Sequence, residues 1–526
     1  MYRISKSVLL AAAIAVGATA DDSGAELDGQ LRRVNIDPQQ FTSAYWRQHG
    51  ERALQHALTV QPIQRKAQNI ILFIGDGNGV TSVTATRIFD GQSRGLAGEE
   101  HLLSFEQLPH VALAKTYNTN QQTPDSAGTM TAIMSGVKTA AGVVGLGPEV
   151  ELGNCHTPPT LPLRSLLDDA RARNKATGIV TTARVTHATP AAIYAHAAHR
   201  NWESDGDIPA SMQPCGEDIA SQLVAATNPM DVVLGGGRAN FLPATMADPE
   251  YPEQSGKRQD GRNLIAEWQQ HNSAGRYLWN AEQFAALPED FTGNILGLFE
   301  PSHLHYEADR EALNGNEPSL SAMTAAAIER LAKNRNGFFL MVEAGRIDHG
   351  HHAGNAYRAL TDGQELSRAV QVALDKTNAE DTLIIVTADH SHVITMAGYP
   401  TRGNPILGQV VANDSRGHAS DSPQLAGDGK PYTTLSYSNG RGYGYADNPA
   451  ERYRSPATAG RHLEAGEITT SKDYHQEALV PLGSETHGGE DVVIYARGPW
   501  AHLLHGVQEQ SYLYYVMRYA LSYGED

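Results

Sequence analysis

Aspartate, glutamate and histidine side chains occur in this chain in combinations that are typical of metal-binding sites. Carboxylates and imidazoles together are the ligands that Zn²⁺ takes in near-tetrahedral sites. Asp348 and His352 are four residues apart, so on a helix they share one face and can bind one ion. Asp389 and His390 are adjacent, which suits a ligand pair only where a strand is already turning. These residue types therefore predict metal-assisted chemistry.

Ser126 is the best candidate for a nucleophile. It lies at the start of a predicted helix, where backbone N–H groups favour an anion. Helix capping alone would also explain a serine at this place. The sequence contains no GxSxG motif and no evident Ser-His-Asp order. A metal ion that lowers the pKa of the serine is therefore the simplest means of activation.

Strands and helices that could position these residues alternate along the chain. Short apolar, β-branched runs predict buried strands at Asn69–Gly75, Val111–Tyr117, Ala176–Thr182, Asp231–Leu234, Gly337–Val342, Asp381–Thr387 and Asp491–Ala496. Helical patterns lie between them, at Asp125–Val137, Leu161–Arg173, Ser319–Asn334 and Ala356–Asn378. This alternation predicts a three-layer α/β/α sandwich around a mainly parallel sheet.

Most of the acid and histidine clusters lie at the ends of the predicted strands. In α/β sheets, ligands bind beyond the carboxyl ends of the strands. The residues that follow strands are Asp76, Ser126, His187, Thr189, Glu343, Asp348, His349, His352, Asp389 and His390, and His487 precedes the last strand. One such residue alone could be a helix cap or a solvated histidine. All the clusters together predict one shared site.

The composition excludes several classes of protein. The 526 residues are 40% hydrophobic and 19% charged, which is typical of a globular chain rather than a disordered one. The 59 acidic residues outnumber the 41 basic ones and give a net charge of −18. This charge argues against a nucleic-acid-binding surface, and it means that a phosphate site needs its own local cation.

The N-terminus has the features of a signal peptide over residues 1–20. Arg3 and Lys6 precede an apolar run from Val8 to Val16, and small residues then lead to a cleavage site after Ala20. The apolar run is too short for a bilayer core, which needs about 20 residues. We therefore expect an exported protein, periplasmic or secreted, without a membrane span.

Export makes the two cysteines, Cys155 and Cys215, candidates for a disulfide. A thiolate metal site is the weaker alternative because CxxC spacing is absent. Residues 21–65 are expected to form an N-terminal arm with a helix at Asp37–Val60, and residues 66–526 the catalytic domain. The polar segments 241–295 and 398–480 interrupt the alternation and predict surface insertions, the first with a short helix at Asn263–His271.

Five motifs, taken in order, resemble those of the alkaline phosphatase family. They are Asp76-Gly77-Asn78-Gly79, Asp125-Ser126-Ala127-Gly128-Thr129, Arg346-Ile347-Asp348-His349-Gly350-His351-His352, Thr387-Ala388-Asp389-His390-Ser391-His392 and Glu485-Thr486-His487. The resemblance spans about residues 66 to 520, and the joint order is highly specific. It implies hydrolysis of small phosphate monoesters at alkaline pH through a phosphoserine, with transphosphorylation as a side reaction, inorganic phosphate as a ligand and a homodimer as the assembly.

The resemblance also implies a role for each matching residue. Ser126 resembles the nucleophile, and Arg200 resembles the guanidinium that binds the phosphate oxygens. Two zinc ions and one magnesium ion per subunit are implied. The first zinc would take Asp348, His352 and His487, the second zinc Asp76, Asp389 and His390, and the magnesium Asp76, Thr189 and Glu343.

Histidine at positions 187 and 349 resembles the vertebrate and some marine bacterial enzymes. In this resemblance, His187 supports proton handling near the magnesium, and His349 lies behind the ligands. The cysteine pair resembles a vertebrate-type disulfide, and residues 398–480 resemble the crown region that covers the dimer interface. A calcium ion on Glu250, Phe299, Glu300 and Glu317 is also implied, although Glu317 stands where the family has aspartate. A salt-bridged insertion without metal is the alternative.

Two other functions remain as alternatives. A phosphodiesterase or sulfatase of the same superfamily uses a related metal site, but their threonine nucleophile or modification motif is not visible. Outside the enzymes, an exported scaffold that binds metal or phosphate without turnover would fit the composition. Every expected ligand position is filled, which argues against that scaffold.

Overall fold

The computed structural model describes residues 36–155, 162–212, 216–224, 229–313, 316–442 and 467–525. The expected signal peptide at 1–20 and one of the two cysteines, Cys215, therefore lie outside the described residues. The disulfide stays a prediction for that reason. Within the described ranges, no helix combines the length and apolarity needed to cross a membrane.

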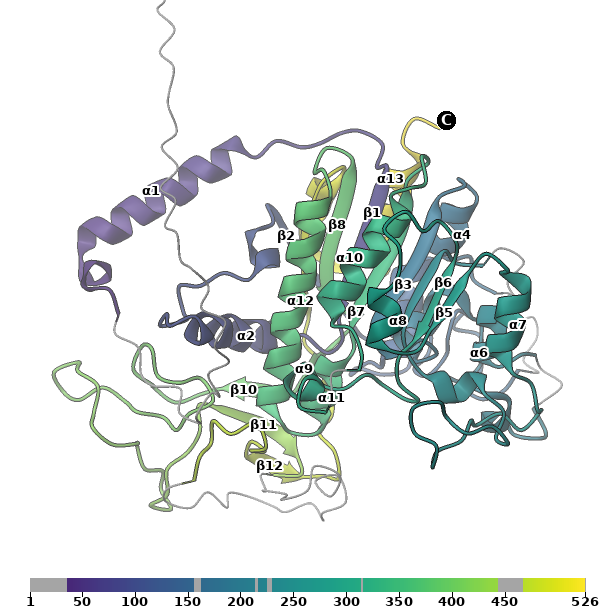
Figure 1. Ribbon diagram of the computed structural model, residues 1–526. Helices are drawn as coiled ribbons and strands as arrows, with labels where there is room; N and C mark the ends of the chain where they lie inside the picture. The colour runs from purple at the N-terminus through teal and green to yellow at the C-terminus, as the bar shows by residue number, and fades with distance from the viewer. Residues whose placement is uncertain are drawn as a thin grey trace, which may run out of the picture.

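A ten-stranded sheet forms the centre of the molecule, in the order β15-β2-β14-β8-β1-β7-β3-β4-β6-β5 (Figure 1). Its strands are β1 (Asn69–Gly75), β2 (His110–Lys115), β3 (Ala176–Arg184), β4 (Val232–Gly236), β5 (Arg276–Leu278), β6 (Ile295–Leu298), β7 (Phe338–Ala344), β8 (Thr382–Ala388), β14 (Val492–Arg497) and β15 (Gly506–Glu509). Among these strands, β14 alone runs antiparallel to its neighbours, β2 and β8. The predicted mainly parallel sheet is confirmed.

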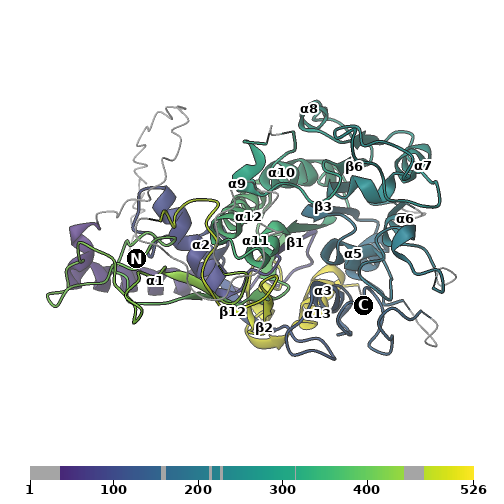
Figure 2. The same cartoon turned by 90° about the horizontal axis from the view of Figure 1, so that it is seen from below.

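Helices cover both faces of the sheet. Successive side chains of a strand point to opposite faces, so each strand contributes to two hydrophobic cores. On β1, Ile70 belongs to a buried cluster that also contains residues of α3 and α13, whereas Phe73, on the opposite face, belongs to a cluster that contains residues of α10 and α12. Figure 2 shows the two helical layers on either side of the sheet. The helices of the first layer are α3 (Ser126–Ser135), α4 (Leu166–Arg171), α5 (Ala188–Tyr194), α6 (Ile219–Val224) and α13 (Tyr512–Ser522). Those of the second are α9 (Glu307–Arg310), α10 (Leu320–Leu331) and α12 (Ala356–Lys376).

The predicted elements are present with shifted ends, and local capping explains the shifts. Helix α4 begins at Leu166 because the Ser165 hydroxyl accepts the Asp168 N–H while the Asp168 carboxylate accepts the Ser165 N–H. Helix α3 ends at Ser135 because Gly136 adopts a left-handed conformation with φ of 77°. Short 3₁₀ helices lie at Pro38–Phe41, Ser104–Gln107, Asp205–Asp207, Arg238–Phe241 and Ala501–Leu503.

The expected surface insertion at 241–295 contributes directly to the core. It contains α7 (Leu264–His271) and α8 (Ala281–Ala285), and Leu264 and Trp268 of α7 are buried. It also contains β5, which pairs with β6 at the edge of the main sheet. A strand of three residues is too short to give a periodic signal in the sequence.

The segment around 398–480 builds a second, smaller sheet below the first in Figure 1. Its strands are β10 (Ile394–Met396), β11 (Leu435–Gly440) and β12 (Ala478–Pro481), and residues 443–466 between them lie outside the described residues. This sheet packs through Leu435 and Tyr437 on Ile88 and Phe89 of α2 (Val80–Ser93).

The N-terminal arm carries helix α1 (Ser43–Thr59), close to the range expected from the sequence. Figure 1 shows α1 at the side of the molecule, away from the central sheet. None of its residues is buried, although its sequence includes Trp46, Leu54 and Leu58.

Candidate active site

Three adjacent central strands end at the candidate site. Asp76 follows β1, Glu343 lies near the end of β7, and Asp389 and His390 follow β8. Because these strands are parallel neighbours, their carboxyl ends meet at one edge of the sheet. The predicted residues from distant parts of the sequence are thereby brought together.

Several buried oxygen atoms at this edge fit metal ions. Both carboxylate oxygens of Asp76 have no hydrogen-bond partner among the described residues, and the same holds for Asp389 Oδ2, Glu343 Oε1 and Thr189 Oγ1. Asp76, Asp389 and Glu343 are fully buried. Buried carboxylates without partners are strongly unfavourable unless they bind a cation. The donor set thus suits divalent metals held by oxygen and nitrogen.

Burial and neighbouring carboxylates raise the pKa values of these carboxyl groups. Burial raises the pKa of Asp76 well above its usual range, and the charges of Asp389 and Asp348 raise it further. Burial also raises the pKa of Glu343 to about 7, against the opposing hydrogen bond from Thr181. A bound divalent cation would favour the ionised forms of both groups.

A first cluster joins Asp348, His352 and His487. Asp348 and His352 lie on α11 (Arg346–His352), one turn apart, as the spacing predicted. The Nε2 atoms of His352 and His487 lie 3.3 and 3.4 Å from Asp348 Oδ1, and 3.1 Å from each other. These distances bring three ligand atoms to one point, as a single ion requires.

Backbone carbonyl groups fix the orientation of the two imidazoles in this cluster. The Nδ1 atom of His352 lies 2.6 Å from the carbonyl oxygen of Glu485, and that of His487 lies 2.8 Å from the carbonyl oxygen of Pro124. A proton on Nδ1 makes each of these contacts a hydrogen bond and leaves Nε2 free to bind a metal.

His392 belongs to the same cluster, although the sequence motifs assigned it no role. It lies on β9 (Ser391–His392), which pairs with β13 (His487–Gly488) and places His392 opposite His487. Its Nε2 lies 2.8 Å from Asp348 Oδ1, and its Nδ1 lies 2.6 Å from Glu485 Oε2. Burial opposes its charged form, but Glu485 and Asp348 outweigh that effect and raise the pKa of His392 to about 10.

Ser126 meets the second cluster at His390. Ser126 is the first residue of α3, and its Oγ lies 3.1 Å from His390 Nε2. The same nitrogen lies 3.4 Å from Asp76 Oδ1 and 3.2 Å from Asp389 Oδ2. The Nδ1 atom of His390 contacts the Ser391 carbonyl at 3.3 Å rather than a carboxylate, so the geometry is not that of a Ser-His-Asp triad.

A third cluster contains Asp76, Glu343 and His187. His187 directly precedes α5, and Thr189 is the second residue of that helix. The Thr181 hydroxyl donates to Glu343 Oε2, which leaves Glu343 Oε1 without a partner among the described residues. The predicted magnesium ligands therefore lie around one small region of the sheet edge.

Arg200 brings a positive charge close to Ser126 and His187. Its Nη1 donates to Asp125 Oδ2 at 2.9 Å, and its Nη2 lies 3.2 Å from His187 Nε2. Asp125 also caps α3 by accepting the N–H of Gly128, so Asp125 joins Arg200 to the helix that begins at Ser126. Burial lowers the pKa of His187 well below its usual range, and the charges of Arg200 and Arg184 lower it further.

His349 and His187 lie in a group of three imidazoles that also includes His303. The ring centroid of His303 lies 4.2 Å from that of His349 and 5.3 Å from that of His187. His303 lies between β6 and α9, and no sequence motif pointed to it. Its contacts depend on the tertiary fold, because β6 and β7 belong to one sheet but are separated in it by β3 and β4.

The residues expected to bind calcium are only partly brought together. Glu300 and Glu317 approach each other, with His305 as the third member of the group. Glu250 instead binds Arg238 Nη2 at 3.0 Å and accepts a hydrogen bond from Asn316 at 2.7 Å. Phe299 is fully buried, and its N–H donates to the Gly235 carbonyl. The calcium ion stays a prediction.

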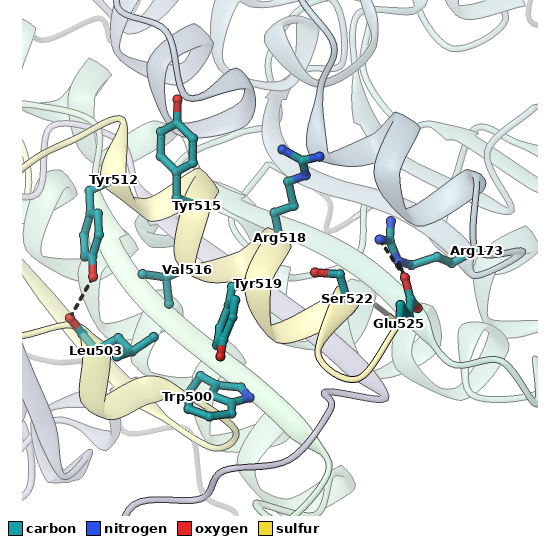
Figure 3. Close-up of a pocket in the computed structure, with 10 residues that line it drawn as sticks. All are labelled: Arg173, Trp500, Leu503, Tyr512, Tyr515, Val516, Arg518, Tyr519, Ser522 and Glu525. Atoms are coloured by element: carbon teal, nitrogen blue, oxygen red, sulfur yellow. Dashed lines mark hydrogen bonds and ion pairs between the residues drawn. The ribbon is translucent and has the colours of Figure 1, made fainter.

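A separate cavity of about 710 Å³ lies along α13, and none of its lining residues belongs to the predicted site. Figure 3 shows the rings of Trp500, Tyr512 and Tyr519 along this cavity. Its aromatic lining contrasts with the carboxylates and imidazoles at the sheet edge.

Comparison with known proteins identifies relatives of the whole chain. A family model described as alkaline phosphatase matches residues 67–523. The tissue-nonspecific isozyme of alkaline phosphatase from Gallus gallus is 47% identical over 488 residues, which cover 91% of this chain and 89% of that protein. Alkaline phosphatase from Gadus morhua is 44% identical over 489 residues, which cover 92% of this chain and 98% of that protein.

Solved structures share the same fold. Thermus thermophilus alkaline phosphatase superposes with a TM-score of 0.60 at 24% sequence identity, covering 89% of this chain and 94% of that chain. At this level of identity the similarity extends to the fold alone.

Proposed function

The chain belongs to the alkaline phosphatase family, and on that premise we propose that it hydrolyses phosphate monoesters through a phosphoserine formed on Ser126. Monoester hydrolysis and dependence on metal ions follow from the family. The observation that carries the phosphoserine is the position of Ser126: its Oγ lies at a helix N-terminus, 3.1 Å from His390 Nε2, among buried carboxylates without hydrogen-bond partners.

We assign two zinc ions and one magnesium ion to three sets of residues. The sets are Asp348, His352 and His487 for the first zinc; Asp76, Asp389 and His390 for the second; and Asp76, Thr189 and Glu343 for magnesium. Bound metals of this kind stabilise negative charge on phosphate oxygens and lower the pKa of a hydroxyl or water. The unpartnered oxygens of Asp76, Asp389, Glu343 and Thr189 support this assignment.

The proposed reaction then proceeds in two displacements at phosphorus. Ser126 Oγ transfers its proton to solvent water and attacks phosphorus, and the ester oxygen leaves from the opposite side and takes up a proton from water. Water next attacks the phosphoserine from the side that the ester oxygen has left, and it releases inorganic phosphate and restores Ser126. Two inversions give overall retention at phosphorus. An alcohol in place of water would give transphosphorylation.

Arg200 orients the phosphate during both displacements. A guanidinium offers parallel N–H donors to two phosphate oxygens. The Nη1 atom of Arg200 donates to Asp125, and its Nη2 atom donates to His187 Nε2, so both contacts hold the guanidinium in place. The depressed pKa of His187 keeps its ring neutral, so it remains an acceptor and adds no competing charge.

The decisive experiment is hydrolysis of p-nitrophenyl phosphate at alkaline pH, with the bis(p-nitrophenyl) phosphate diester and p-nitrophenyl sulfate in parallel. Each assay is run before chelation, after chelation and after addition of zinc and magnesium. We expect fast monoester turnover that chelation abolishes and the metals restore, with slow turnover of the other two. Faster diester or sulfate turnover would favour the phosphodiesterase or sulfatase alternative, which the phosphatase relatives do not favour.

Ser126→Ala tests the phosphoserine directly. We expect kcat to fall by at least about a thousandfold, because the covalent intermediate cannot form. Rapid-quench measurements with ³²P-labelled substrate should detect phosphoprotein in the wild type and none in the variant. Ser135→Ala, at the other end of α3, is the matched control. Equal phosphoprotein in the Ser126 variant would rule out Ser126 as the nucleophile.

We also propose a homodimer and export from the cytoplasm. The exposed apolar residues of α1 support the dimer, because nothing among the described residues buries any residue of this helix. The basic, apolar and small-residue pattern of residues 1–20 supports export.

A further inference from the structure

Glu203 lies three residues after Arg200 and belongs to none of the residue sets assigned above. It is 8% exposed, and four hydrogen bonds converge on its carboxylate. Arg184 donates from Nη2 to Oε1 at 2.6 Å and from Nε to Oε2 at 2.8 Å. The Thr186 hydroxyl and the side-chain amide of Asn240 also donate to Oε2, at 2.6 and 2.9 Å. These donors fill the acceptor capacity of the carboxylate, so Glu203 binds parts of the protein to one another.

The donors link two segments of the candidate site. Arg184 ends β3 and Thr186 directly precedes His187, whereas Glu203 belongs to the loop that carries Arg200. The same two segments meet where Arg200 Nη2 donates to His187 Nε2 at 3.2 Å. Glu203 therefore supplies a second connection between the segment of His187 and the segment of Arg200.

The loop that carries Arg200 has little regular backbone structure. Residues 198–204 form neither a helix nor a strand. The N–H of Arg200 donates to the Gly142 carbonyl at 2.8 Å, and the Glu203 carbonyl accepts from the N–H of Ala220 at 3.1 Å. A displacement of about 1 Å at an active site can lower the rate about a hundredfold, so side-chain contacts that hold this loop affect function.

The carboxylate of Glu203 is held in its charged form. Burial opposes that form, but the hydrogen bonds and charge of Arg184 and the Thr186 hydroxyl outweigh burial, so the pKa of Glu203 lies below its usual range. Glu203 thus balances the positive charge of Arg184 and occupies two of its nitrogen atoms. The third, Nη1, donates to Ser302 Oγ at 3.3 Å. Arg184 is therefore an anchor, and Arg200 is the guanidinium available to phosphate.

We propose that Glu203 is a positioning residue for phosphate binding: it joins the segment of His187 to that of Arg200 and so holds the Arg200 guanidinium in place. The inference rests on the phosphate-binding role proposed for Arg200. The competing explanation is a buried ion pair that stabilises the fold and does nothing more. Asp169 forms a pair of that kind with Arg164, so burial of the pair alone does not distinguish the two explanations.

A double-mutant cycle in the mature enzyme, saturated with zinc and magnesium, tests the proposal. Glu203→Gln, Arg200→Ala and the double variant are compared with wild type for kcat and KM on p-nitrophenyl phosphate and for the inhibition constant of inorganic phosphate. Glu203→Gln should raise KM and the inhibition constant about tenfold each and change kcat less. It should add nothing in the Arg200→Ala background, because it acts through Arg200.

Asp169→Asn is the matched control. Asp169 is 2% exposed and accepts from Arg164 Nε and the Tyr514 hydroxyl, both at 2.8 Å. It lies in α4, before β3 begins, whereas Arg184 ends that strand. Asp169→Asn should lower the melting temperature and leave phosphate inhibition unchanged.

Thr186→Val gives a milder test in case Glu203→Gln does not fold. It removes one hydrogen bond to Glu203 and keeps the pair with Arg184. The inhibition constant of phosphate should rise about twofold or more. Unchanged phosphate inhibition in both variants, with a lower melting temperature, would establish the purely structural ion pair. Losses that multiply in the double variant would also overturn the proposal. Unchanged inhibition in Arg200→Ala alone would instead reject the role of Arg200, and this inference with it.

Discussion

Arg200 is the residue on which phosphate recognition should depend most. Its guanidinium is oriented by Asp125 and His187, and the chain has a net charge of −18. Arg200→Ala should lower kcat/KM for p-nitrophenyl phosphate by about a hundredfold and weaken inhibition by inorganic phosphate. Arg200→Lys should restore only part of the loss, because lysine lacks the planar pair of donors. Unchanged phosphate inhibition in Arg200→Ala would contradict the role.

His392 should control zinc affinity without binding the ion. It donates to Asp348 at 2.8 Å and to Glu485 at 2.6 Å, so it holds the ligand carboxylate in place. His392→Ala should lower zinc affinity by about tenfold or more, measured as activity remaining at graded chelator concentrations. His351→Gln is the control, since the His351 ring lies beside His392, with centroids 4.8 Å apart, but contacts Ser82 and Tyr437 instead of Asp348. Identical chelator curves for wild type and His392→Ala would refute this role.

The position of a candidate site residue was predictable where its own motif placed it at the end of a strand or the start of a helix. Asp76, Ser126 and Asp389 follow strands or open helices, and the structure places them at one sheet edge. His392 was part of a quoted motif, but its contact with Asp348 depends on the pairing of β9 with β13. His303 and His305 have no local signal at all. The tertiary fold determines which residues these two histidines contact, and those contacts cannot be read from a single sequence.

Lys175, just before β3, should make the stability of the sheet depend on pH. Its Nζ donates to the carbonyl groups of Gln68 and Asn336, both at 2.7 Å. Burial, with the charges of Lys66 and Arg173, lowers the pKa of Lys175 from 10.5 to about 8. Between these values the unfolded chain keeps a proton that the folded chain has lost. The free energy of unfolding therefore rises with pH, by up to about 3 kcal/mol.

Urea unfolding of wild type and Lys175→Met between pH 7 and 10.5 measures the contribution of Lys175 to the pH dependence of the free energy of unfolding. The stability advantage of the wild type over the variant should grow as the pH rises. Lost hydrogen bonds to the two carbonyl groups add a penalty that does not change with pH. Lys376→Met, which removes an exposed ion pair with Glu329, is the control and should show no such slope. Parallel stability curves for wild type and Lys175→Met would disprove the assignment.

At the level of elements, long apolar strands were the most predictable part. The range predicted for β1, Asn69–Gly75, agrees with the structure because its side chains are buried on both faces and form a continuous apolar run. The three-residue β5 was missed, since its length gives no periodicity. The start of α4 was placed too early, because the Ser165 capping box sets the helix boundary and a broad apolar pattern does not.

For the whole molecule, α1 should decide the oligomeric state. Leu54 and Leu58 are one turn apart, and they are 58% and 65% exposed. Replacing both by glutamate should convert the proposed dimer into monomers at micromolar concentration, because charge would oppose burial of this face. Light scattering after gel filtration measures the mass. Gln55→Glu, on the same helix, is the control, and an unchanged mass for the double variant would exclude α1 from the interface.

The architecture as a whole followed from the sequence because alternation of strands and helices permits few arrangements. A mainly parallel sheet between two helical layers was predicted and found. The order of strands was not predictable, since no local signal states that β14 lies between β2 and β8. Packing in three dimensions determines which strands from distant parts of the sequence become neighbours in the sheet.

The position of β14 has a consequence for how the chain is made. This strand lies near the C-terminus, yet it fills an interior place in the sheet between β2 and β8. Until the ribosome has made β14, the edges of β2 and β8 that will face it have no partner strand. Such unpaired edges promote aggregation. Folding must therefore finish after translation, and the large sequence separation makes it slow. His487 lies five residues before β14, so a prematurely terminated chain lacks both a closed sheet and one of the residues proposed to bind zinc.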